Sequence, residues 1–215
     1  MPLTRFHLPN ASSPREPKGM MMEKLDVAVL IGSLRADGFS ARNARTLTGL
    51  APERMALRRL EIGHLPHFNQ DEENKPPASY GPFRQSVARA DAVLFITPEF
   101  NRGLPGVLKN AVDVASRPWG KNSFDGKPAA VMSLSVGALG GFGANHALRQ
   151  ALVTLNMPVM AQPEAYFPNV SELFNAHGDL SHAGSLAFLR QFVAAFEVWI
   201  DRNRQPIRQD ERSVA

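Results

Sequence analysis

The residues whose side chains could take part in binding or catalysis lie in three short polar stretches, each of which follows a run of apolar residues. The first stretch, GSLRADGFS (32–40), comes after the strand-like DVAVLIG. Ser33, Arg35 and Ser40 provide two hydroxyls and one guanidinium, and free N–H groups are expected where a helix begins after them. This donor set suits a terminal phosphate. The alternative is that Ser40 caps the helix and Arg35 is a surface charge.

The second stretch, TPEFNRGLPG (97–106), follows the most apolar strand-like run of the chain, AVLFITP. Two prolines and a glycine stiffen its backbone, while Glu99, Phe100 and Asn101 project from it. A rigid edge beside one aromatic side chain suits a planar heteroaromatic ring. The same pattern also fits a turn into a helix, with Asn101 as the cap.

The third stretch, SLSVGALGGFG (133–143), contains four glycines that allow close approach of a ligand or simply a turn. It lacks Gly-x-Ser-x-Gly, so Ser135 is not expected to be a hydrolase nucleophile. Elsewhere His64 and His67 are spaced as metal ligands can be, but no third ligand of matching pattern is present. We therefore expect no metal site.

The composition narrows the classes of function. The chain has 215 residues and no cysteine, which excludes disulfides and thiol catalysis. Its net charge of +4 lies at the two ends, because residues 26–201 contain 16 basic and 16 acidic side chains. A neutral core without a basic stripe does not indicate nucleic-acid binding. No apolar run approaches the roughly 20 residues that span a bilayer, so a cytoplasmic protein without a membrane anchor is expected.

Short apolar runs alternate with helix-period segments along the chain. Strands are predicted over 26–32, 55–62, 92–98, 128–137 and 158–167, and helices over 39–50, 81–90, 105–116, 141–155 and 184–202. Nearly continuous apolar strands indicate a parallel sheet covered on both faces. The prediction is an α/β fold: a doubly wound, five-stranded parallel sheet with helices on both faces. It occupies residues 25–202, between a disordered tail (1–24) and a basic tail (203–215).

Ligands of such sheets bind beyond the carboxyl ends of the strands. The three polar stretches follow the first, third and fourth predicted strands, so they should meet at one edge. Together they resemble the NADPH-dependent FMN reductase family, a flavodoxin-like group that includes chromate and quinone reductases. The matching segments are GSLR (32–35), PEFNRGLPGVLKNA (98–111) and Ser135–Arg149, with Phe100 in place of the family's tyrosine.

The resemblance implies a bound, non-covalent FMN. By the family's pattern, the first stretch holds the phosphate, the second borders the isoalloxazine ring, and the third borders the far edge of the ring. Arg102 lies just past the ring-binding loop, where we expect it to meet an anionic cofactor or acceptor or to make an ion pair at an interface. The residues implied in cofactor binding are Ser33, Arg35, Gly38, Phe39, Ser40, Pro98, Glu99, Phe100, Asn101, Arg102, Ser135 and Gly137.

The resemblance further implies an enzyme in which the flavin carries the chemistry. NADPH or NADH donates hydride, and quinone-like, azo or metal-oxyanion (chromate-type) acceptors receive it by a ping-pong cycle. A homodimer or homotetramer is expected, with loop 64–80 as a candidate contact. The alternative is a non-enzymatic FMN electron carrier, but such carriers tend to be acidic and this core is neutral. The intact Ser33/Arg35 loop argues against a module that has lost its flavin.

Overall fold

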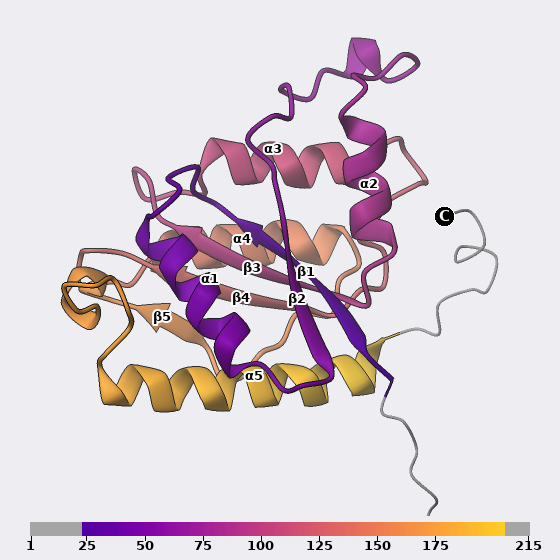
Figure 1. Cartoon of the computed structure of the whole chain (residues 1–215). Helices are drawn as coiled ribbons and strands as arrows, with labels where there is room; N and C mark the ends of the chain where they lie inside the picture. Colours follow the sequence, from indigo (N-terminus) through magenta and orange to yellow (C-terminus); the bar gives the residue numbers. More distant parts are fainter. Residues whose placement is uncertain (1–22, 205–215) are drawn as a thin grey trace, which may run out of the picture.

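Five parallel strands form the centre of the protein (Figure 1). The computed structural model describes residues 23–204. The strands lie in the order β2-β1-β3-β4-β5. The chain adds β2 on one side of β1 and then adds β3, β4 and β5 on the other side, so the strand order switches between β1 and β3. Their bounds are β1 Leu25–Ile31, β2 Met55–Leu60, β3 Ala92–Pro98, β4 Ala129–Leu134 and β5 Ala165–Phe167.

Helices cover both faces of the sheet (Figure 1). On one face, apolar side chains of α1 and α5 pack against the strands, and on the other face those of α2, α3 and α4 do so. The helices are α1 Phe39–Leu50, α2 Tyr80–Ala88, α3 Gly106–Ala115, α4 Phe142–Thr154 and α5 Ala183–Asn203. Two short 3₁₀ helices, Gln70–Glu72 and Val170–Leu173, lie in the connections.

The register brings the carboxyl ends of the central strands level. Ile31 pairs with Ile96 at the end of β1, and Pro98 pairs with Leu134 at the end of β3. The three central strands are buried almost throughout, which explains their continuous apolar runs. The three polar stretches consequently leave the sheet at the same edge, next to the switch between β1 and β3.

The predicted order of elements is confirmed, while one strand is much shorter than predicted. Of the expected strand 158–167, only Ala165–Phe167 pairs along β4, apart from an isolated bridge between Val159 and Ala129. Pro158 and Pro163 have no N–H to give to a ladder, which limits pairing in this segment. The predictions for 1–22 and 205–215 lie outside the described residues.

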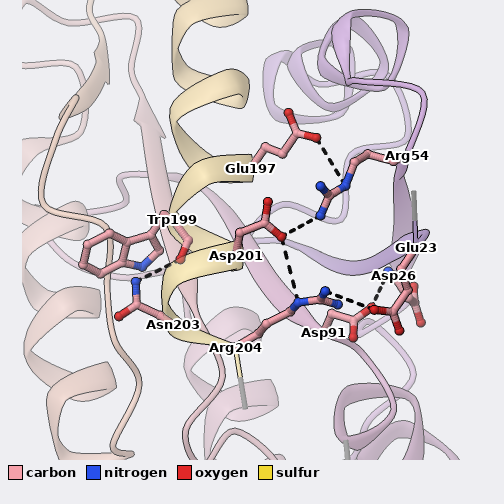
Figure 2. Close-up of polar contacts among 9 residues, drawn as sticks. All are labelled: Glu23, Asp26, Arg54, Asp91, Glu197, Trp199, Asp201, Asn203 and Arg204. Atoms are coloured by element: carbon pink, nitrogen blue, oxygen red, sulfur yellow. Dashed lines mark hydrogen bonds and ion pairs between the residues drawn. The ribbon is translucent and has the colours of Figure 1, made fainter. Parts of the chain in front are cut away.

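A chain of ion pairs joins α5 to the start of the sheet at the opposite edge (Figure 2). Arg54 contacts Glu197 at 3.4 Å and Asp201 at 2.6 Å, and Arg204 contacts Glu23 at 3.0 Å. The helix α5 is also long and apolar enough to span a membrane by length and composition alone. Its apolar row, which includes Phe192 and Phe196, is instead buried in the core, as the sequence predicts for this aromatic face.

Candidate functional site

The first loop ends in an open helix N-terminus. Gly38 is the N-cap residue of α1, no side chain among residues 23–204 caps the helix, and its first turn contains no acidic residue. Ser40 lies inside the helix and is 2% exposed, so its interpretation as the cap is wrong. The loop is held by a bond from the Arg35 N–H to Ser33 Oγ and by a bond from Gly38 N–H to the Arg35 carbonyl. Free amides and hydroxyls thus share one wall with Arg35.

The second loop is a tight two-residue turn. Phe100 and Gly103 exchange backbone hydrogen bonds of 3.1 and 2.9 Å around Asn101 and Arg102. Both central residues have positive φ, 50° and 64°, which is the conformation of a type I′ turn. Positive φ costs a non-glycine residue about 1–2 kcal/mol. Asn101 does not cap α3, whose N-cap residue is Pro105, so that alternative is wrong.

Glu99 turns away from the tip of this loop toward α4. Its carboxylate accepts the Ala144 N–H at 3.1 Å, and the Arg102 guanidinium lies 3.6 Å from it. Its side chain is only 8% exposed. At Gly143, a Cβ atom would lie 2.8 Å from the Arg102 carbonyl oxygen and 2.9 Å from the Glu99 carboxylate. Glu99 therefore braces the second loop against the N-terminus of α4.

The third loop lies on a buried polar network. Ser133 donates to the Gly140 carbonyl, and Asn145 donates to Ser133 Oγ at 3.1 Å. Arg149 in turn donates to Asn145 Oδ1 at 2.8 Å. Above this network Ser135 Oγ accepts the Gly137 N–H, and residues 136–139 are exposed. The fixed network leaves the backbone of the third loop presented at the edge of the sheet.

Two hollows lie at these loops, one where all three loops meet and one between the first loop, the second loop and the start of α3. We call the smaller one, of about 240 Å³, the inner cleft, and the larger one, of about 480 Å³, the outer cleft. Ser33, Arg35 and Phe100 line both. The outer cleft is further lined by Gly32, Leu34, Pro105, Gly106 and Val107.

The structure brings most of the predicted site residues to the inner cleft. These are Ser33, Arg35, Gly38, Phe39, Ser40, Pro98, Glu99, Phe100 and Ser135. Asn101, Arg102 and Gly137 are exposed nearby but do not line it. Sequence reasoning missed the apolar lining residues Leu34, Leu134, Val136 and Val170, for which only their position beside the motifs gave a signal.

Two other expectations concern residues near the site. Phe100 is 55% exposed, so it is not a core residue. Within residues 23–204 no group of three or more His, Cys, Asp and Glu side chains could hold a metal ion, and His64 and His67 are exposed. The inner cleft offers the donors that a phosphate monoester needs, and the exposed ring of Phe100 lines the same cleft. That donor set fits FMN.

Comparisons with known proteins agree with this chemistry. Residues 25–172 match the family "NADPH-dependent FMN reductase". A quinone reductase of Pseudomonas putida is 50% identical over 185 residues, covering 86% of this chain and 99% of that protein. A 2-hydroxy-1,4-benzoquinone reductase of a Burkholderia species is 39% identical over 84% of this chain and 98% of that protein.

Solved structures share the fold. The flavoenzyme NAD(P)H:(acceptor) oxidoreductase FerB of Paracoccus denitrificans has a TM-score of 0.78 and 40% identity, covering 83% of this chain and 98% of that chain. A flavodoxin, WrbA-like protein of Agrobacterium tumefaciens has a TM-score of 0.56 at 16% identity, covering 84% and 100%, and shows the flavodoxin-like fold alone. The protein described here belongs to the NADPH-dependent FMN reductase family and is an enzyme that uses FMN with NAD(P)H.

Proposed function

We propose that the protein binds FMN in the inner cleft and catalyses electron transfer from NAD(P)H to small quinones. The observation that carries this proposal is the meeting of three loops around one hollow. Ser33, Arg35 and Ser40 lie at the start of α1, and Phe100 lines the same hollow. Two of the relatives are named as a quinone reductase and a 2-hydroxy-1,4-benzoquinone reductase, and these names support quinones as the acceptors.

The first loop is assigned to the FMN phosphate. Ser33 and Ser40 supply hydroxyl donors, the first turn of α1 supplies amides, and Arg35 supplies the charge. Gly38 and Phe39 shape the bend that presents them. A charge-assisted hydrogen bond contributes about 1.5–3 kcal/mol, so the Arg35 contact alone favours FMN over riboflavin by about one to two decades.

The second and third loops are assigned to the isoalloxazine ring. Pro98, Glu99 and Phe100 border it on one side, and Ser135 and Gly137 border its far edge. Bound FMN supplies the hydride chemistry, so the protein needs only to position the reactants and tune the electrostatics. Asn101 and the 76% exposed Arg102 lie on the loop tip, where Arg102 is assigned to meet anionic groups of a co-substrate or acceptor.

The outer cleft is assigned to the two substrates in turn. It is larger than the inner cleft and shares Phe100 with it. NAD(P)H leaves before the acceptor enters, which is a ping-pong cycle. Quinones are the acceptors that we favour, because the relatives are named as quinone reductases. Azo compounds and chromate-type oxyanions are further proposed acceptors. The protons for the reduced product are assigned to water.

A homodimer or homotetramer completes the proposal. Five large apolar side chains are between 52% and 67% exposed in and near the loops of the site: Leu34, Phe100, Val136, Leu139 and Phe142. Exposed apolar residues gathered at one place are typical of a contact surface. Residues 25–202 act as the one reductase domain, in the cytoplasm.

Visible absorption of the purified protein tests the proposed function. The oxidised flavin spectrum should bleach on addition of NADPH and return on addition of benzoquinone, with continued NADPH oxidation while quinone lasts. Reduction without sustained turnover would indicate an electron carrier instead. An FMN-loaded protein that does not oxidise NADPH or NADH in the presence of benzoquinone would contradict the proposal.

A further inference from the structure

A cluster of charges lies within the proposed phosphate loop. Asp37 is in the bend between Arg35 and Gly38, and its carboxylate accepts one hydrogen bond of 2.6 Å from Arg42 and another of 2.6 Å from Arg45. Arg42 also donates from Nε to the backbone carbonyl of Asp37 at 3.2 Å. Arg42 therefore holds both the side chain and the backbone of the same loop residue.

Arg42 is itself enclosed by Phe39 of its own helix and by the segment 174–178. Its guanidinium carbon lies 5.8 Å from the centre of the Phe39 ring and 5.9 Å from that of the Phe174 ring. Gly178 has a φ of +85°, and a Cβ atom there would lie 3.0 Å from Arg42 Nη1. The side chain of Arg42 is 24% exposed, against 59% for Arg45. Arg42 is thus packed in place, whereas Arg45 is an exposed partner.

The negative charge of Asp37 lies in the loop proposed to bind a phosphate, and Arg42 and Arg45 compensate for it. The hydrogen bonds from Arg42, and then from Arg45, hold the pKa of Asp37 below its ordinary value, so the carboxylate is ionised at neutral pH. A bare carboxylate repels a dianionic phosphate bound in the same loop. The two guanidinium groups neutralise it, and together with Arg35 they leave the loop positively charged.

We propose that Arg42 is a positioning residue which, through Asp37, sets the shape and charge of loop 33–40 and so the preference for FMN over riboflavin. Arg42 acts without touching the flavin. The inference rests on the proposed function, in which this loop holds the phosphate. Exposed ion pairs contribute little to stability, so the effect is expected in ligand discrimination more than in melting temperature.

Titrations of FMN and riboflavin into the flavin-free protein test this inference. Arg42→Gln should weaken FMN binding about tenfold, because the loop then carries one positive charge fewer beside the phosphate, and should leave riboflavin affinity unchanged. Arg42→Lys should restore only part of the loss, because an ammonium group cannot reproduce the fork geometry. The matched control is Arg89→Gln, an equal change of charge at the exposed end of α2, which should alter neither affinity.

A double variant shows whether Arg42 acts through Asp37. In Arg42→Gln the carboxylate loses its better-packed partner, and adding Asp37→Asn removes the repulsion. The double variant should therefore bind FMN more tightly than Arg42→Gln alone. Arg45→Gln, which removes only the exposed partner, should give a smaller loss in the same direction and serves if Arg42→Gln does not fold.

Several outcomes would overturn the inference. If Arg42→Gln leaves the ratio of FMN affinity to riboflavin affinity unchanged, Arg42 has no role in discriminating between the two flavins. The same holds for Arg45→Gln where that variant replaces Arg42→Gln. Equal losses for both flavins indicate a merely structural side chain, and a double variant no better than the single one excludes action through Asp37. If the unmodified protein binds FMN and riboflavin equally, the proposed phosphate site itself is wrong.

Discussion

Glu99→Ala removes the buried carboxylate that joins the second loop to α4. The Ala144 N–H donates to this carboxylate at 3.1 Å, and the side chain is 8% exposed. A hydrogen bond to a charged group contributes about 1.5–3 kcal/mol, and a negative charge at a helix N-terminus about 0.3–1 kcal/mol. The pair with the exposed Arg102 adds little. We expect the free energy of unfolding to fall by about 2–3 kcal/mol on the same grounds.

Urea denaturation of the flavin-free protein measures this loss. Glu99→Gln keeps an acceptor oxygen of similar reach and should lose only about 1 kcal/mol, the contribution of the charge. The matched control is Asp113→Asn, which breaks a pair with Lys109 on the exposed surface of α3 and should cost at most about 0.5 kcal/mol. An unchanged midpoint for Glu99→Ala, or a loss no larger than that of the control, would refute the bracing role.

Three further predictions concern other parts of the molecule. Phe100→Tyr should keep FMN affinity and turnover in titration and steady-state assays, whereas Phe100→Ala should lose about tenfold in one of them, as expected for an aromatic contact. Burial raises the pKa of both tyrosines, Tyr80 and Tyr166, above the ordinary value of 10.0, so the midpoint of phenolate formation should lie above that pH in the folded protein. Because the pKa of these phenols is higher in the folded state than in the unfolded state, their contribution to stability is complete below pH 10.0 and is lost as the pH rises further. A titration midpoint at the ordinary value of 10.0 would contradict this prediction. Arg54→Ala should lower the free energy of unfolding, measured in urea, by about 1–2 kcal/mol because the contacts with Asp201 and Glu197 are lost. FMN affinity should not change, and a changed affinity would link this distant edge of the sheet to the site.

The fold could be predicted because most strands are buried on both faces. The run at 92–98 is apolar except for Thr97 and is β3, and the helix predicted over 39–50 is α1 with the same bounds. The segment 158–167 looked like a full strand because its residues are largely apolar. Only its last three residues pair along β4, since strand length at a sheet edge depends on which N–H groups meet a partner.

The site could be predicted as a set of loops, but not the direction of each side chain. Ser33 and Arg35 were predicted to share a site, and they line the same cleft. Glu99 was expected to border a ring, yet its carboxylate also binds an amide of α4, 45 residues further along the chain. The contact of Arg42 with Gly178 is likewise formed only by folding. Local sequence carries no record of such long-range partners.

Binding of FMN and riboflavin to the unmodified protein and to Arg35→Ala tests the central claim most directly. Arg35 lines both clefts at the start of the phosphate loop. The unmodified protein should bind FMN more tightly than riboflavin, and Arg35→Ala should lose about one to two decades of FMN affinity while its riboflavin affinity stays the same. Equal affinity for the two flavins in the unmodified protein, or full FMN affinity in Arg35→Ala, would contradict the assignment of this loop to the phosphate.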